Sequence, residues 1–131
     1  MKKVIAIDFD GCLCTDAWPE IGRPYMDVIS KAKHEQENGA ALILWTCREG
    51  KLLRDAVNAA ARWGLTFDAV NDNIREMKAR YNNNPRKIGA TEYWDDRAIC
   101  MPPKDAKAVF NNYGSGGTFI DNVDGTVNIN L

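Results

Sequence analysis

The sequence has little of several features that would point to a particular class of protein. It contains a single histidine, His34, so we do not expect a catalytic mechanism based on histidine. No apolar stretch approaches the length of a membrane span, and no block of basic residues suggests nucleic acid as a partner. Two lysines precede the first apolar run, which leaves no room for a signal peptide. We therefore expect a cytoplasmic protein that does not enter a membrane, and the charge pattern disfavours nucleic acid as a partner.

The four cysteines also lack a recognisable pattern. Cys12, Cys14, Cys47 and Cys100 have no paired C-x-x-C spacing, and a disulfide framework is unexpected in a reducing compartment. Cys12 and Cys14 could in principle ligate a soft metal, but small, partly buried residues behind a strand are the more common case. We assign no catalytic role to cysteine.

The totals are those of an ordinary globular domain. The chain has 131 residues, of which 45% are hydrophobic and 27% charged, with a net charge of −1. We expect one domain over residues 1–131, with a core over about 1–113 and a C-terminal β-hairpin over about 117–131.

Apolar runs and helical patterns alternate along the chain. Two unbroken apolar runs, 4–7 and 40–45, are typical of strands buried on both faces of a sheet. Helices are predicted over about 25–38 and 50–63, each closed by a glycine. The weaker patterns predict, in order, a strand over 66–70, a short helix near 73–80, a strand over 92–94 and a last helix over about 103–112. This order predicts an α/β fold, a three-layer doubly wound (Rossmann-like) parallel sheet.

The tail of the chain has a different pattern. Residues 118–131 alternate around Asp124-Gly125, a dipeptide that favours two-residue hairpin turns. Such a turn would place Ile120 opposite Ile129. We therefore expect an antiparallel hairpin appended to the sheet.

Polar side chains follow several of the predicted strands. Asp8 and Asp10 follow the first strand, Thr46 the second, and Asp95 and Asp96 the strand over 92–94. Because parallel strands share one carboxyl edge, where ligands bind in open α/β folds, these groups should converge. Taken alone, the Asp-x-Asp-Gly segment could equally be a surface turn. Four carboxylates around one point instead make an oxygen site suited to Mg²⁺, which keeps waters for a phosphate.

The same edge offers the other groups that phosphoryl transfer needs. The Thr46 hydroxyl and the Lys87 ammonium could neutralise charge on a phosphoryl group together with the metal. One aspartate can then act as nucleophile, forming an aspartyl-phosphate that water hydrolyses. A second aspartate can protonate the leaving oxygen and later deprotonate the water.

Four motifs in the chain resemble those of the haloacid dehalogenase (HAD) superfamily of phosphatases. They are hydrophobic-Asp-Phe-Asp-Gly, hydrophobic-Thr, a lysine and Asp-Asp, in this order, over residues 4 to about 100. The resemblance implies that Asp8 is the nucleophile and Asp10 the general acid/base, whose backbone carbonyl also binds Mg²⁺. It further implies that Asp96 ligates the metal, with Asp95 doing so directly or through water. The implied metal set is therefore Asp8, Asp10, Asp95 and Asp96.

For the basic residues near the motifs, more than one assignment is open. On the resemblance, Thr46 holds the transferring phosphoryl group and Lys87 binds it, although Lys78 and Arg86 compete for the lysine position. We prefer Lys87 because Pro-Arg-Lys-Ile ahead of Tyr-Trp-Asp-Asp-Arg-Ala resembles short members of the superfamily. In addition, Arg48 and Arg97 could bind substrate, or could form surface salt bridges.

The spacing of the motifs leaves no room for the cap domains that the superfamily inserts between them. The intervals from Asp8 to Thr46 and from Thr46 to Lys87 are filled by predicted core elements. We therefore expect a capless member with an open site. Such a site admits large substrates or calls for a second copy of the chain, and the hairpin and the loop carrying Trp18 and Tyr25 are candidates for covering it.

The main functional hypothesis is a Mg²⁺-dependent phosphomonoester hydrolase that acts on a small phosphorylated metabolite. A receiver-like signalling domain also combines acidic residues, a threonine and a lysine, but there the acidic pair precedes the phosphoacceptor aspartate. A non-catalytic phospho-ligand binding module on the same fold is the third class. Sugar phosphates, nucleotides, phospho-amino acids and a polynucleotide 3′-phosphate all remain open as substrates.

Overall fold

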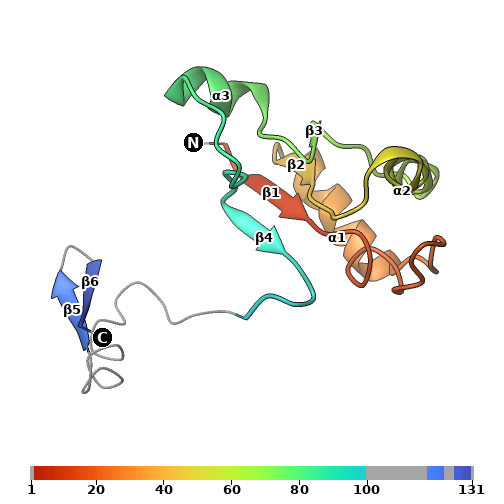
Figure 1. The fold of residues 1–131 in the computed structure, drawn as a ribbon. Helices are drawn as coiled ribbons and strands as arrows, with labels where there is room; N and C mark the ends of the chain where they lie inside the picture. Colours follow the sequence, from red (N-terminus) through yellow and green to blue (C-terminus); the bar gives the residue numbers. More distant parts are fainter. Residues whose placement is uncertain (1, 100–117, 123–125, 131) are drawn as a thin grey trace. The chain divides into compact units, whose positions relative to one another are not determined.

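The computed structural model describes residues 2–99, 118–122 and 126–130, and divides the chain into two units, Met1–Ala98 and Ile99–Leu131. The described elements are, in order, β1 (Val4–Ile7), α1 (Met26–Glu37), β2 (Ala41–Leu44), α2 (Gly50–Arg62), β3 (Ala69–Val70), α3 (Arg75–Tyr81), β4 (Glu92–Trp94), β5 (Thr118–Asn122) and β6 (Thr126–Asn130) (Figure 1). The first unit ends at Ala98, earlier than the core end expected near residue 113. The helix predicted over 103–112 lies outside the described residues.

The first unit is built on a four-stranded parallel sheet with the order β3-β2-β1-β4. All four residues of β1 and of β2 are buried, as expected for central strands that are covered on both faces. Ile7 at the end of β1 pairs with Leu44 of β2 and with Trp94 of β4. The residues that follow these three strands therefore lie along one edge of the sheet.

Helices cover both faces of this sheet, which gives the three layers (Figure 1). Side chains alternate across a strand, so the odd-numbered residues of β1 pack with Ile29 of α1 and Ala60 of α2. The even-numbered residues pack on the other face with Ile74, which precedes α3, and with Ile88. The α/β Rossmann-like fold predicted from the alternating pattern is confirmed.

The helices and strands begin and end close to the predicted residues, with one shortened strand. The glycines after α1 and α2, Gly39 and Gly64, have φ values of +100° and +96°, so they turn the chain out of each helix. The strand expected over 66–70 is reduced to Ala69–Val70. Its shortening follows from Asp68, whose carboxylate accepts the Leu42 N–H at 2.8 Å in place of a backbone carbonyl.

The second unit contains the predicted hairpin, with a different register. Strands β5 and β6 are antiparallel, and Asn122 pairs with Thr126, so three residues separate the paired ends instead of two. Phe119 is consequently the partner of Ile129. The expectation that Ile120 faces Ile129 is wrong by one residue.

None of the helices in the described part of the chain is long and apolar enough to span a bilayer.

Candidate active site

Three carboxylates meet where β1 and β4 end. The backbone N–H of Asp8 donates to the carbonyl of Trp94 at 2.9 Å, which extends the ladder between β1 and β4 by one residue. Asp95 and Asp96 follow immediately on β4. Oxygen atoms of Asp8, Asp95 and Asp96 all lie within 4.8 Å of one another. The predicted convergence of carboxylates is therefore present for these three residues.

Gly11 allows the loop after β1 to pass against one of these carboxylates. Its φ is +85°, in the left-handed region that side chains disfavour. A Cβ at Gly11 would also lie 2.5 Å from Oδ2 of Asp96. The glycine of the Asp-Phe-Asp-Gly segment is thus required both by its backbone conformation and by the position of Asp96.

The carboxylate cluster makes ionisation of Asp8 unfavourable. Burial, followed by the negative charges of Asp95 and Asp96, raises the pKa of Asp8 to about 7, although the N–H of Phe9 acts in the opposite direction. Burial and the same carboxylates raise the pKa of Cys12 to about 12, so this cysteine is a neutral thiol. Closely spaced carboxylate oxygens are the hard ligands that Mg²⁺ prefers, and this donor set fits the predicted ion.

Asp10 has a different environment because a buried arginine binds its carboxylate. Arg48 Nε donates to one oxygen of Asp10 at 2.8 Å and Nη2 to the other at 2.7 Å. The remaining donors of the guanidinium reach the carbonyls of Pro19, Leu52 and Glu20. All five N–H groups are thereby used, and Arg48 is only 2% exposed. Of the two expected roles, the salt bridge is present, but it is a buried pair within the site and not a surface pair.

Phe9 separates the two aspartates and anchors them to the core. Its side chain is fully buried and stacks on Trp63 with ring centroids 5.9 Å apart. The guanidinium of Arg48 lies over the same ring, 5.1 Å from its centre. Since successive side chains of extended backbone alternate in direction, burying Phe9 leaves Asp8 and Asp10 to line the pocket.

The backbone of Thr46 is held at the end of β2 by a residue that the sequence did not single out. Oδ1 of Asn71 accepts the backbone N–H of Thr46 at 2.8 Å. The Thr46 hydroxyl oxygen accepts the backbone N–H of Arg48 at 3.1 Å. The hydroxyl proton of Thr46 therefore stays available to a ligand. Asn71 follows β3 with a φ of +50°, a conformation that asparagine tolerates better than most residues. Its only sequence signal is its place in Asn-Asp-Asn after a strand.

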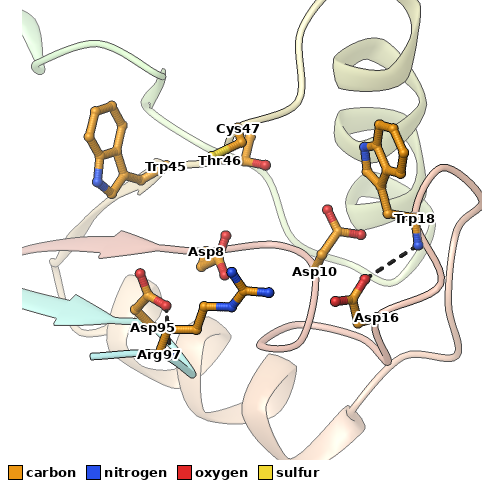
Figure 2. A pocket seen from close by; sticks show the side chains of 9 residues that line it. All are labelled: Asp8, Asp10, Asp16, Trp18, Trp45, Thr46, Cys47, Asp95 and Arg97. Carbon is orange, nitrogen blue, oxygen red and sulfur yellow. Dashed lines mark hydrogen bonds between the residues drawn. The ribbon is translucent and has the colours of Figure 1, made fainter. Parts of the chain in front are cut away.

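These groups face a pocket of about 460 Å³ (Figure 2). Its lining consists of Asp8, Asp10, Asp16, Trp18, Trp45, Thr46, Cys47, Asp95 and Arg97. Arg97 is the basic side chain of this lining, and its backbone N–H donates to Asp95 at 2.9 Å. The pocket thus combines five predicted site residues with Trp18, which was expected only in a covering loop, and with three side chains that were assigned no part in the site chemistry, Asp16, Trp45 and Cys47.

Lys87 lies in an adjoining hollow of about 360 Å³ that shares Trp45 and Asp95 with the first pocket. Its ammonium is 5.9 Å from the centre of the Tyr93 ring. The competing Lys78 forms an ion pair with Asp72 at 2.9 Å. The assignment of Lys87 as the phosphate-binding lysine stays a prediction.

The fold and the site define a parallel α/β domain with an acidic, oxygen-rich site at the carboxyl edge of its sheet. No protein-family model matches the chain, and no curated protein does. The solved structure of a conserved protein from Bacteroides thetaiotaomicron is 33% identical, with a TM-score of 0.67 over 79% of this chain and 84% of that chain. The chain belongs to the same family as that conserved protein.

Proposed function

We propose that the protein is a Mg²⁺-dependent phosphomonoester hydrolase of the HAD type that works through an aspartyl-phosphate on Asp8. The observation that carries this proposal is the cluster formed by Asp8, Asp95 and Asp96, whose oxygens lie within 4.8 Å of one another. The cluster lies at the carboxyl edge of a parallel sheet, and the Thr46 hydroxyl and Asp8 line the same pocket. Metal ligands, nucleophile and phosphate donor would then lie within reach of one substrate phosphate.

The three clustered carboxylates would hold the metal. Bound there, Mg²⁺ would supply positive charge that keeps Asp8 ionised and stabilises the oxygens of the transferring group. The Thr46 hydroxyl would donate to one phosphoryl oxygen. Arg97, which lines the pocket, and Lys87, from the adjoining hollow, are the cations proposed to approach the others.

The chemistry divides into two steps that use Asp8 and Asp10 differently. In the first step a carboxylate oxygen of Asp8 attacks phosphorus, the ester P–O bond breaks, and Asp10 gives a proton to the leaving oxygen. In the second step water attacks the phosphorus of the aspartyl-phosphate while Asp10 takes a proton from the water. Inorganic phosphate leaves and Asp8 is regenerated. Asp10 must carry a proton when the ester binds, and it regains that proton from water in the second step. Arg48 binds both oxygens of Asp10 in the free protein, so we assign it as a positioning residue that fixes the direction of this carboxyl.

The test is release of phosphate from p-nitrophenyl phosphate in the presence of Mg²⁺. We expect EDTA to abolish turnover and Asp8→Asn to do the same. Asp27→Asn is the matched control, because Asp27 is an exposed aspartate in the first turn of α1, outside this pocket. Unimpaired turnover in Asp8→Asn would exclude Asp8 as the nucleophile, and turnover that survives EDTA would exclude the metal.

A further inference from the structure

Two tryptophans on the rim of the pocket are unusually exposed. Trp18 is 60% exposed and Trp45 37%. Both line the pocket, and their rings lie on opposite sides of it in Figure 2. The other two tryptophans are half-buried, and Trp63 stacks on Phe9 in the core. Large flat rings exposed around a concave polar site are suited to stacking on a planar ligand.

Both rim tryptophans are carried by backbone that the rest of the site holds in place. Arg48 donates to the carbonyls of Pro19 and Glu20, at 3.2 and 2.7 Å, directly after Trp18. The N–H of Trp45 continues the ladder between β1 and β2 with a bond of 2.8 Å. Because the supporting backbone is already hydrogen-bonded, a ligand that stacks on these rings has to order only their side-chain rotamers.

The charges around Trp18 restrict what else the ligand can carry. Asp16 lines the pocket beside Trp18, and its carboxylate lies 3.4 Å from the Trp18 backbone N–H. An exposed carboxylate accepts hydrogen bonds from hydroxyl groups and repels a second phosphate. Arg48 already binds the other carboxylate on this side, that of Asp10. The site therefore favours a leaving group with a planar ring and hydroxyls and without further negative charge.

We propose that the substrate is a nucleoside monophosphate, with its base stacked on Trp18, its sugar hydroxyls donating to Asp16 and its phosphate at Asp8. This inference rests on the proposed hydrolase function. The pocket volume of about 460 Å³ is in the range of small-molecule sites. In the reaction, the phosphoryl group passes to Asp8 and the nucleoside leaves with the proton from Asp10. Water then supplies the fourth oxygen of inorganic phosphate.

The experiment compares kcat/KM for adenosine 5′-monophosphate and ribose 5-phosphate, which share the phosphate and sugar and differ in the base. Stacking of one base changes affinity by roughly 5- to 150-fold on alanine substitution. We expect a preference of that size for the nucleotide, largely lost in Trp18→Ala and retained in Trp18→Phe. Tyr81→Ala is the matched control, since Tyr81 is an aromatic residue of α3 that is 55% exposed and lies outside this pocket.

The outcomes separate the two proposals. Equal kcat/KM for the two substrates, with turnover that still requires Asp8, overturns the nucleoside inference and leaves the hydrolase standing. Absence of any Asp8-dependent turnover overturns the hydrolase. Titration with adenosine alone tests stacking without turnover, because it should quench tryptophan fluorescence in the wild type and less in Trp18→Phe. A wild-type protein whose fluorescence adenosine does not change refutes the stacking.

Discussion

Arg48 offers the sharpest test of how the site is held together. The Arg48→Met variant keeps much of the side-chain volume and removes all five donors. The carboxylate of Asp10, which is 17% exposed, then loses both of its bonds to the guanidinium. The carbonyls of Pro19, Glu20 and Leu52 lose their donors as well. A single substitution thus leaves one charge and three carbonyl oxygens without these partners.

The size of the effect follows from burial. Removing one partner of a buried ion pair typically costs about 3–5 kcal/mol, because the other charge remains without compensation. That is a large part of the roughly 5–15 kcal/mol by which domains are stable. Arg48→Lys should lose less, since an ammonium keeps the charge but has only three donors. Arg48→Met combined with Asp10→Ala should be more stable than the sum of the single changes predicts.

Urea unfolding at 25 °C, followed by tryptophan fluorescence, measures these changes. All four tryptophans lie between residues 18 and 94, so the signal reports on the first unit. Lys51→Met is the matched control because Lys51 also pairs with an aspartate, Asp55, but is 77% exposed. Removing that pair should cost no more than about 0.5 kcal/mol. A loss in Arg48→Met as small as that of the control would refute the reasoning.

Three further predictions concern the metal cluster and the basic residues. Gly11→Ala should reduce Mg²⁺ affinity, measured by calorimetry, and activity. It should also destabilise the protein more than Gly39→Ala, measured by urea unfolding. Both glycines have positive φ, but of these two only Gly11 would place its Cβ against another residue. Asp8 has a pKa of about 7 in the folded protein, against an ordinary value of 3.8, so the free energy of unfolding of the metal-free protein should fall as pH rises from about 4 to about 7. Asp8→Asn should remove that fall, and an unchanged profile would contradict the raised pKa. Lys87→Ala should lower kcat and Arg97→Ala should raise KM; a Lys87→Ala variant with wild-type kinetics would remove Lys87 from the site.

The part of the site that depends on strand ends could be predicted from the sequence. Two apolar runs and a short aromatic strand, each followed by polar residues, are local signals. Parallel pairing then brings Asp8 and Asp95 to one edge, whatever the intervening loops do. The alternation of strands and helices predicted the layers for the same reason.

The contacts that loops make could not be predicted in this way. Arg48 binds a carboxylate 38 residues away, and nothing in the Thr-Cys-Arg segment distinguishes a buried arginine from an exposed one. Asn71, which accepts the Thr46 backbone N–H, has a left-handed backbone conformation. A single asparagine in the sequence is not enough to predict that conformation. The predicted hairpin register was wrong because it assumed a two-residue turn, which Asp124-Gly125 favours. The pairing of Asn122 with Thr126 leaves three residues between the strands.

The burial of Phe9 has a consequence for how this site can change during evolution. Its ring belongs to the hydrophobic core, while its two sequence neighbours carry the carboxylates of the pocket. A smaller side chain at this position would leave a cavity under Arg48 and beside Trp63, and the segment that aims both aspartates would lose its anchor. Selection on core packing and selection on site geometry therefore act on the same residue. Neither property can drift here without changing the other.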